Sequence, residues 1–193
     1  MPARSALLIV DVQNDFCAGG ALAVTDSAPV IESLNRRIDE AASAGMPVFA
    51  SRDWHPAITN HFAPFGGPWP VHCVAESNGA RFHPDLRLRA DTVVISKGQD
   101  PGSPGYSAFD GRTADGTLFG DDLRKRGITH LYVGGLATDY CVKHSVLDAL
   151  AAELEVTVLV DSIAGVDANP GDARRAIDEM RAKGATLGAD ALS

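Results

Sequence analysis

Five short runs of mostly apolar residues constrain the fold of this chain more than any other feature of its sequence. They lie at residues 6–10, 47–50, 92–95, 131–133 and 156–160. The runs do not alternate between apolar and polar residues, which is typical of strands in a parallel sheet covered on both faces. Segments with helical spacing of apolar residues are interspersed with them, at residues 27–44, 118–126, 139–152 and 170–183. This order predicts an α/β fold, in which helices cover both faces of one mainly parallel sheet.

Two of the predicted helices begin at residues that favour a helix start. Asn169 is expected to cap the last helix, with Pro170 at its first helical position. Thr138 is expected to cap the helix that begins at residue 139. Cys141 would then lie in the first helical turn, where unpaired backbone N–H groups and the helix dipole favour a thiolate over a thiol.

The composition is that of one globular domain, which we expect to span residues 1–193. Apolar residues make up 45% of the chain and charged residues 22%. A net charge of −8 would repel a phosphate backbone, which argues against nucleic acid as a partner. No apolar run approaches the length that spans a bilayer, so no membrane contact is expected. The odd, sparse set of Cys17, Cys73 and Cys141 indicates reduced thiols and a cytoplasmic location.

A long segment at residues 51–91 interrupts the strand and helix pattern. Its five prolines forbid regular helix or sheet over most of its length. A loop this long in a compact domain is usually functional or disordered. Its dense aromatic residues favour burial in a core or pocket over disorder. They are Trp54, Phe62, Phe65, Trp69 and Phe82.

Three chemically useful residues come shortly after predicted strands. Asp11 follows residues 6–10, Lys97 follows residues 92–95, and Cys141 follows residues 131–133. Since the carboxyl ends of parallel strands share one edge of a sheet, the three side chains can meet there. A thiol nucleophile needs a base to take its proton and gains from a nearby cation. Singly, each residue has a simpler reading: a turn residue, a solvated charge and a small buried side chain, respectively.

The loop at residues 52–91 also carries a set of residues that can bind a metal. They are Asp53, His55, His61 and His72. Asp53 and His55 are separated by one residue, so in an extended chain they point to the same side. Imidazole and carboxylate ligands suit one divalent Fe, Mn or Zn ion, and the sequence leaves the choice among them open. The alternative for each histidine alone is an ordinary polar loop residue.

With the residues around them, the two sets of reactive side chains resemble the nicotinamidase/pyrazinamidase family of the isochorismatase-like cysteine hydrolases. The likeness covers nearly the whole chain in the same order. Asp, Lys and Cys alone would indicate only the wider superfamily, whereas the Asp and His set is the specific signal. The matching segments are residues 9–16 (IVDVQNDF), 51–56 (SRDWHP), 69–73 (WPVHC), 97–98 (KG), 106–109 (YSAF) and 135–142 (GLATDYCV).

The resemblance implies a three-layer α/β/α domain with a central, mainly parallel six-stranded sheet, the isochorismatase-like hydrolase fold. It implies that Cys141 forms a thioester with a nicotinoyl group, that Asp11 moves the thiol proton to departing ammonia, and that Lys97 holds Asp11. It also implies an oxyanion hole formed by the backbone N–H groups of Ala137 and Cys141. The Leu136–Ala137 peptide bond is expected to be cis.

The implied substrate is the small molecule nicotinamide, which would be hydrolysed to nicotinate and ammonia in NAD salvage. Pyrazinamide would be hydrolysed as well. A metal ion held by the Asp and His set would bind the pyridine nitrogen. Three aromatic residues would stack on the ring, with a plain core role as the alternative. They are Phe16, Trp69 and Tyr106. The oligomeric state does not follow from the sequence.

Other functions fit part of these observations. An amidase acting on a ureido or N-carbamoyl compound would need Asp11, Lys97 and Cys141 but no metal. A non-catalytic metal-binding or thiol-sensing module would keep the fold and a reactive Cys141 without turning over a substrate. Hydrolysis of isochorismate fits less well, because that branch of the superfamily does not need a nucleophilic cysteine.

Overall fold

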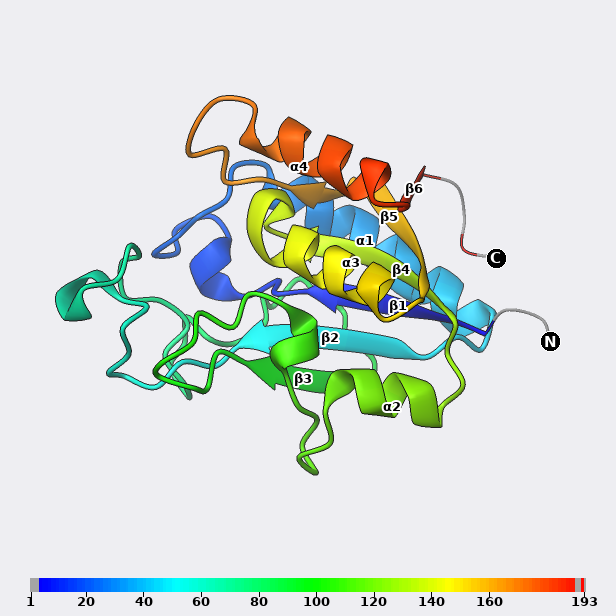
Figure 1. Cartoon of the computed structure of the whole chain (residues 1–193), viewed down its shortest axis with the longest axis horizontal. Helices are drawn as coiled ribbons and strands as arrows, with labels where there is room; N and C mark the ends of the chain where they lie inside the picture. The colour runs from blue at the N-terminus through cyan, green and yellow to red at the C-terminus, as the bar shows by residue number, and fades with distance from the viewer. Residues whose placement is uncertain (1–3, 190–191, 193) are drawn as a thin grey trace.

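A six-stranded sheet forms the centre of the molecule in the computed structural model, which describes residues 4–189 and 192 (Figure 1). All neighbouring strands are parallel, in the order β3-β2-β1-β4-β5-β6. The strands are β1 Ser5–Val10, β2 Val48–Asp53, β3 Val93–Lys97, β4 His130–Leu136, β5 Glu155–Ala164 and β6 Thr186–Gly188. The five apolar runs are all strands, and the sixth strand implied by the resemblance is present at the edge of the sheet.

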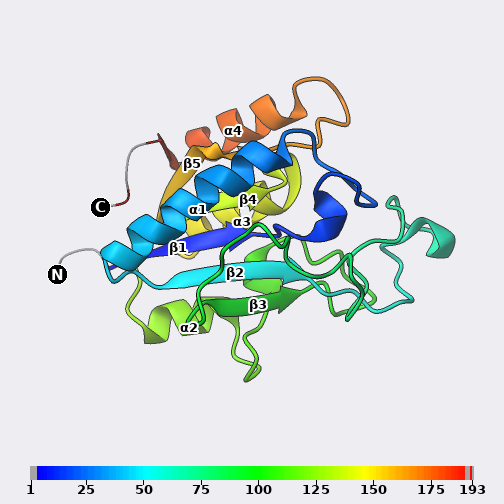
Figure 2. The ribbon, with the colours of Figure 1, turned by 180° about the vertical axis from the view of Figure 1, so that it is seen from behind.

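Helices cover both faces of the sheet, which confirms the predicted α/β/α arrangement. They are α1 Ser27–Ser43, α2 Phe119–Lys125, α3 Lys143–Ala151 and α4 Asp172–Ala182. Helix α1 lies on one face, while α2, α3 and α4 lie on the other (Figures 1 and 2). This placement buries side chains on both faces of the central strands, which explains why those strands are apolar without alternation.

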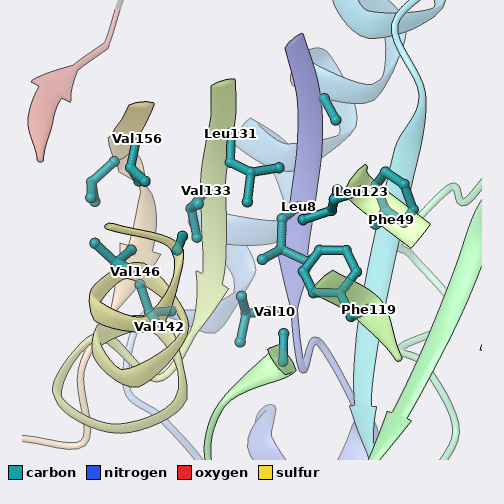
Figure 3. Close-up of a cluster of buried hydrophobic side chains, with 14 of the residues drawn as sticks. Leu8, Val10, Phe49, Phe119, Leu123, Leu131, Val133, Val142, Val146 and Val156 are labelled. Carbon is teal, nitrogen blue, oxygen red and sulfur yellow. The ribbon is translucent and has the colours of Figure 1, made fainter. Parts of the chain in front are cut away.

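Successive residues of β1 belong to two different hydrophobic cores. Leu8 and Val10 point toward α2 and α3, and Leu7 and Ile9 belong to the core beneath α1. Figure 3 shows the first of these cores, in which side chains of β1, β2 and β4 meet those of α2 and α3. Each fully buried leucine or isoleucine stabilises the fold by about 1.5–3 kcal/mol relative to an exposed one. The two cores therefore fix β1 at the centre of the sheet.

The last helix begins later than the sequence predicts. Helix α4 starts at Asp172, and Gly171 is its N-cap residue. The backbone of Gly171 is left-handed, with φ of 87°, so the chain turns at this residue and Pro170 lies outside the helix. Asn169 is therefore not the cap, and its side-chain amide instead donates to Asp172 Oδ2 at 3.1 Å.

The carboxyl ends of β1, β2, β3 and β4 meet the long irregular loops on one side of the molecule (Figure 2). Residues 54–92, between β2 and β3, include a short 3₁₀ helix at Ala63–Phe65. This edge is where parallel α/β sheets place their ligand sites. Within the described part of the chain, the helices all fall short of the length and apolar character needed to cross a bilayer.

Candidate active site

Asp11, Lys97 and Cys141 meet at the carboxyl edge of the sheet. Asp11 directly follows β1, Lys97 is the last residue of β3, and Cys141 lies in the turn after β4. Lys97 Nζ lies 2.8 Å from Asp11 Oδ2 and 3.5 Å from Cys141 Sγ. The structure therefore brings together the three residues that the sequence places after different strands.

Lys97 is buried and has partners on several sides. Besides Asp11, its ammonium group contacts Asp53 Oδ1 at 2.5 Å and donates to the Gly105 carbonyl at 3.1 Å. Burial alone lowers the pKa of Lys97, but the two carboxylates raise it well above its ordinary value. Lys97 thus stays a cation at neutral pH, and its interpretation as a solvated surface charge is wrong.

Asp11 is a fully buried carboxyl group with a raised affinity for protons. Burial raises the pKa of Asp11 above its ordinary value, although Lys97 lowers it in part. The Ser51 hydroxyl donates to Asp11 Oδ1 at 2.7 Å and orients the carboxyl group. A positioned carboxylate with a raised pKa is suited to act as a general base.

The segment that carries Cys141 differs from the predicted helix start. Residues Thr138–Val142 form a five-residue turn of π-helix, and α3 begins only at Lys143. Ala137 is the residue that precedes the turn, and no side-chain capping bond is present there in the described structure. Thr138 is therefore not an N-cap. Single π-helical turns are rare in proteins, and those that occur are often found at functional sites.

Burial also changes the expected protonation of the thiol. Desolvation raises the pKa of Cys141 well above its ordinary value, and the nearby Lys97 offsets only part of this. The predicted lowering of the thiol pKa is therefore wrong, because the loss of water outweighs the effect of the nearby cation. A neutral thiol needs an acceptor for its proton when it reacts. A carboxylate oxygen of Asp11 lies within 4.8 Å of Cys141 Sγ.

The Asp and His set lies beside the Lys97 ammonium group. Asp53 is the last residue of β2 and pairs with Lys97 in the register of β2 and β3. The Nε2 atoms of His55 and His72 lie 3.5 and 3.9 Å from Asp53 Oδ2. One ring nitrogen each of His55, His61 and His72 lies within 4.8 Å of the others. The three imidazole rings thus converge on one point, and the Asp53 carboxylate lies beside two of them.

Hydrogen bonds orient two of the three imidazole rings. His55 Nδ1 lies 2.9 Å from the Gly98 carbonyl oxygen, and His72 Nδ1 lies 2.8 Å from that of Pro70. Because a carbonyl oxygen only accepts, each Nδ1 carries a proton, and in the neutral ring Nε2 keeps its lone pair. Within the described part of the chain, the buried His55 Nε2 has no hydrogen-bond partner. A metal ion at the point of convergence would accept the lone pair of this nitrogen.

The protonation of the set also fits a divalent cation. Burial, reinforced by His55 and His72, lowers the pKa of His61 to about 4. Burial likewise lowers the pKa of His72. Burial raises the pKa of Asp53, but Lys97 and His55 lower it by a larger amount. The net pKa is below its ordinary value, so the Asp53 carboxylate stays ionised. Neutral imidazoles with an anionic carboxylate are the ligands that Fe, Mn and Zn accept in proteins.

A cavity lies between the Cys141 thiol and the imidazole rings of His61 and His72. Its walls include Phe16, Trp69 and Tyr106, the three aromatic residues that the resemblance implies. Trp69 Nε1 donates to the Tyr106 hydroxyl at 2.8 Å, which joins the loop after β2 to the loop after β3. Ala137 and Cys141 also line the cavity, and the peptide bond that precedes Ala137 is cis. The cavity is therefore mostly apolar and lies next to the Cys141 thiol.

Three residues that line the cavity are not among the site residues predicted from the sequence. They are Leu22, Tyr140 and Val166. Tyr140 immediately precedes Cys141, and this position next to the thiol is a signal that could have indicated it. Leu22 and Val166 lie on loops and carry no local signal. The loop at Val166 is held by Asp139, whose Oδ1 accepts from the Val166 N–H at 2.9 Å.

Comparison with known proteins places this chain in a family. It matches the Isochorismatase domain over residues 5–190. Nicotinamidase of Escherichia coli (strain K12) is 46% identical over 203 residues, which cover 97% of this chain and 95% of that protein. The structure of pyrazinamidase of Pyrococcus horikoshii in complex with zinc has a TM-score of 0.88 at 39% identity, covering 96% of this chain and 98% of that one.

A second solved structure with a similar fold contains a small acid. PnC1 from L. infantum in complex with nicotinate has a TM-score of 0.81 at 31% identity, and the match covers 96% of this chain and 92% of that one. The relatives and the matched domain extend over nearly the whole chain. The chain belongs to the isochorismatase family and, within it, to the nicotinamidase/pyrazinamidase group.

Proposed function

We propose that this protein is a metal-dependent amidase that hydrolyses nicotinamide to nicotinate and ammonia through a thioester on Cys141. One observation supports the proposal most directly: the Cys141 thiol lines the same cavity as His61 and His72. Beside it, the Lys97 ammonium group contacts the carboxylates of both Asp11 and Asp53. The E. coli relative is named a nicotinamidase, and the similar structures contain zinc or nicotinate. Pyrazinamide is a second expected substrate, because it keeps a ring nitrogen at the same place relative to the amide.

The covalent chemistry would be divided between Cys141 and Asp11. As Cys141 Sγ attacks the amide carbon and forms the S–C bond, the thiol proton passes to Asp11. The C–N bond then breaks, and Asp11 returns the proton to the leaving nitrogen, which departs as ammonia. Water that loses a proton to Asp11 then attacks the thioester carbon, and the C–S bond breaks. Asp11 returns that proton to Cys141 Sγ and restores the thiol, while nicotinic acid leaves and ionises to nicotinate.

The surroundings of the thiol would stabilise the charge that develops in these steps. The Lys97 ammonium group balances the negative charge that is shared by Asp11 and Cys141. The backbone N–H groups of Ala137 and Cys141 would donate to the oxyanion on the amide carbon. One such donor is worth roughly 3–4 kcal/mol of the activation barrier.

The ring of the substrate would be held on the other side of the cavity. The proposed metal ligands are Asp53, His55, His61 and His72. A divalent Fe, Mn or Zn ion bound there supplies a coordination position for the pyridine nitrogen. Phe16, Trp69 and Tyr106 would pack on the ring and exclude water. In this orientation the carboxamide of the substrate points at Cys141.

The same proposal includes the setting in which the enzyme works. We infer one catalytic domain over residues 1–193 that acts in the cytoplasm on a small-molecule substrate in NAD salvage. The odd number of cysteines supports a reducing compartment, and Cys17, Cys73 and Cys141 are all free thiols in the structure.

Ammonia release from nicotinamide by the purified protein tests the proposal. Protein loaded with Zn²⁺, Mn²⁺ or Fe²⁺ is expected to release ammonia and nicotinate in equal amounts. The Cys141→Ala variant is expected to be inert while it keeps its bound metal. No turnover by wild-type protein with any of the three metals would refute the proposed activity.

Chelation separates this function from the alternative amidase. Removal of the metal is expected to abolish turnover of nicotinamide, and its return should restore it. Activity on a ureido or N-carbamoyl compound that survives prolonged chelation would favour the metal-independent amidase. Nicotinate is expected to protect Cys141 from iodoacetamide, whereas a non-catalytic thiol-sensing module would show no such protection.

A further inference from the structure

The connection between β1 and α1 contains polar residues that the proposed chemistry does not use. Gln13 and Asp15 lie in it between Asp11 and Phe16. Gln13 is fully buried, and most buried polar side-chain atoms have at least one hydrogen-bond partner. Both side chains bind the main chain of the loop that carries the proposed metal ligands.

Gln13 binds the backbone of Asp53 at two points. Its Oε1 accepts from the Asp53 N–H at 2.7 Å, and its Nε2 donates to the Asp53 carbonyl at 2.8 Å and to the Ala80 carbonyl at 2.9 Å. The paired residues of β1 and β2 end at Ile9 and Ala50. The Gln13 amide therefore takes the place of a neighbouring strand for Asp53, which pairs with β3 on its other side.

Asp15 holds the chain next to His72 in a similar way. Asp15 Oδ2 accepts from the Cys73 N–H at 2.6 Å. Cys73 has a left-handed backbone with φ of 44°, which is unfavourable for a residue other than glycine and needs support from its surroundings. A Cβ atom at Gly79 would lie 2.0 Å from Asp15 Oδ2, so only glycine leaves room for this carboxylate.

We infer that Gln13 and Asp15 are positioning residues that set Asp53 and His72 for metal binding, through the backbone rather than through the ligand side chains. The inference rests on the metal site of the proposed function. Residues that orient metal ligands typically change metal affinity by about 10- to 100-fold when they are replaced. A side chain that only stabilises the loop would change the free energy of unfolding without this selective loss of affinity.

Metal affinity measured on purified, metal-free protein by competition with a fluorescent chelator tests the inference without any assay of activity. Gln13→Ala and Asp15→Ala are each expected to weaken Zn²⁺ and Mn²⁺ binding by about 10- to 100-fold. Asp15→Asn keeps an acceptor for the Cys73 N–H and is expected to recover most of the affinity. Should Gln13→Ala fail to fold, Gln13→Glu keeps the shape but places an acceptor against two carbonyl oxygens, so the same loss is expected.

Asn14 provides a matched control within the same segment. Its Nδ2 donates to the Asn78 carbonyl at 2.8 Å, so it also binds this loop, but at a residue that is neither a proposed ligand nor next to one in the sequence. Asn14→Ala is expected to keep the metal affinity within about twofold of wild type. Equal affinities for wild type, Gln13→Ala and Asp15→Ala would overturn the inference while the proposed function stands. A wild-type protein that binds neither metal would refute the proposed metal site itself, and this inference with it.

Discussion

Lys97 and Asp53 lie opposite each other in neighbouring parallel strands, and the Lys97 ammonium group contacts the Asp53 carboxylate at 2.5 Å. The same ammonium group contacts Asp11 at 2.8 Å and Cys141 Sγ at 3.5 Å. One buried cation therefore joins the groups proposed to react with the amide to a residue proposed to hold the metal.

Replacement of Lys97 by Met is expected to affect both stability and activity. It would leave the carboxylates of Asp11 and Asp53 buried without their cation, which typically costs about 3–5 kcal/mol of the free energy of unfolding. The rate of nicotinamide hydrolysis is expected to fall by about two to four orders of magnitude. Urea unfolding and ammonia release measure the two effects.

A second substitution checks the cause of that instability. Lys97→Met combined with Asp11→Asn removes a buried negative charge together with the cation. The double variant is expected to regain roughly 0.5–3 kcal/mol relative to Lys97→Met alone. A double variant that is less stable than both single variants would show that packing, and not buried charge, explains the loss.

Gly98 is expected to be essential for the orientation of His55. Its φ is 68°, and a Cβ atom there would lie 2.5 Å from His55 Cε1. Gly98→Ala is therefore expected to destabilise the fold by about 1–2 kcal/mol and to displace the imidazole ring. Metal affinity, measured by competition with a chelator, should fall by about 10-fold or more.

Gly116→Ala is the matched control for Gly98→Ala. Gly116 has φ of 84°, but nothing lies within 4 Å of the position of a Cβ atom. The backbone cost is expected to be similar, about 1–2 kcal/mol, with metal affinity unchanged. If both variants lost metal affinity equally, the contact with His55 would not be the cause.

The hydrogen bond between Trp69 and Tyr106 is expected to support substrate binding. Trp69→Phe and Tyr106→Phe each keep an aromatic ring and remove this bond of 2.8 Å. Each is expected to lower kcat/KM for nicotinamide by about 3- to 10-fold, the worth of one hydrogen bond. The double variant should lose little more than either single variant, because both remove the same interaction. Fully additive losses would contradict this coupling.

Asp161 is expected to make stability depend on pH in the acid range. Burial raises its pKa, but hydrogen bonds from Arg37 and Ser33 lower it by a larger amount. The pKa of Asp161 therefore lies below its ordinary value. Its ionised form contributes stability that is complete above the pKa of the unfolded chain, about 3.9, and is lost as pH falls through the folded value. Because Asp161 is partly exposed, solvent screens its charge, and Asp161→Asn is expected to lose about 0.5–1 kcal/mol at pH 7.

Urea unfolding of wild type and Asp161→Asn at several pH values measures this contribution. The difference in the free energy of unfolding is expected to stay constant from pH 7 to about pH 5 and to shrink below about pH 4. A difference that does not change down to pH 3 would mean that the carboxylate of Asp161 does not stabilise the fold through its charge.

Local patterns predict most of the strands but not all of them. The runs at residues 6–10 and 131–133 are apolar because their strands are covered on both faces, so the physical cause is visible in the sequence itself. Strand β6 has only three residues, Thr186–Gly188, and none is fully buried. Such a strand forms because β5 offers an unpaired edge, and no period in its own residues predicts it.

Capping preferences and thiol chemistry are less reliable guides, because tertiary contacts override them. The π-helical turn at Thr138–Val142 replaces the expected helix start, so Thr138 caps nothing. Cys141 lies among buried groups, and the resulting desolvation raises its pKa where a helix N-terminus alone would lower it.

By itself, the sequence determined the type of sheet and which reactive side chains follow its strands, because burial on both faces and the residues at strand ends are local properties. Only the tertiary structure decided that the Lys97 ammonium group contacts the carboxylates of both Asp11 and Asp53, since these contacts depend on the register between strands distant in the chain. It also decided that Leu22 and Val166 complete the cavity. Contacts between separate loops arise from the packing of the whole chain, and no short pattern records them.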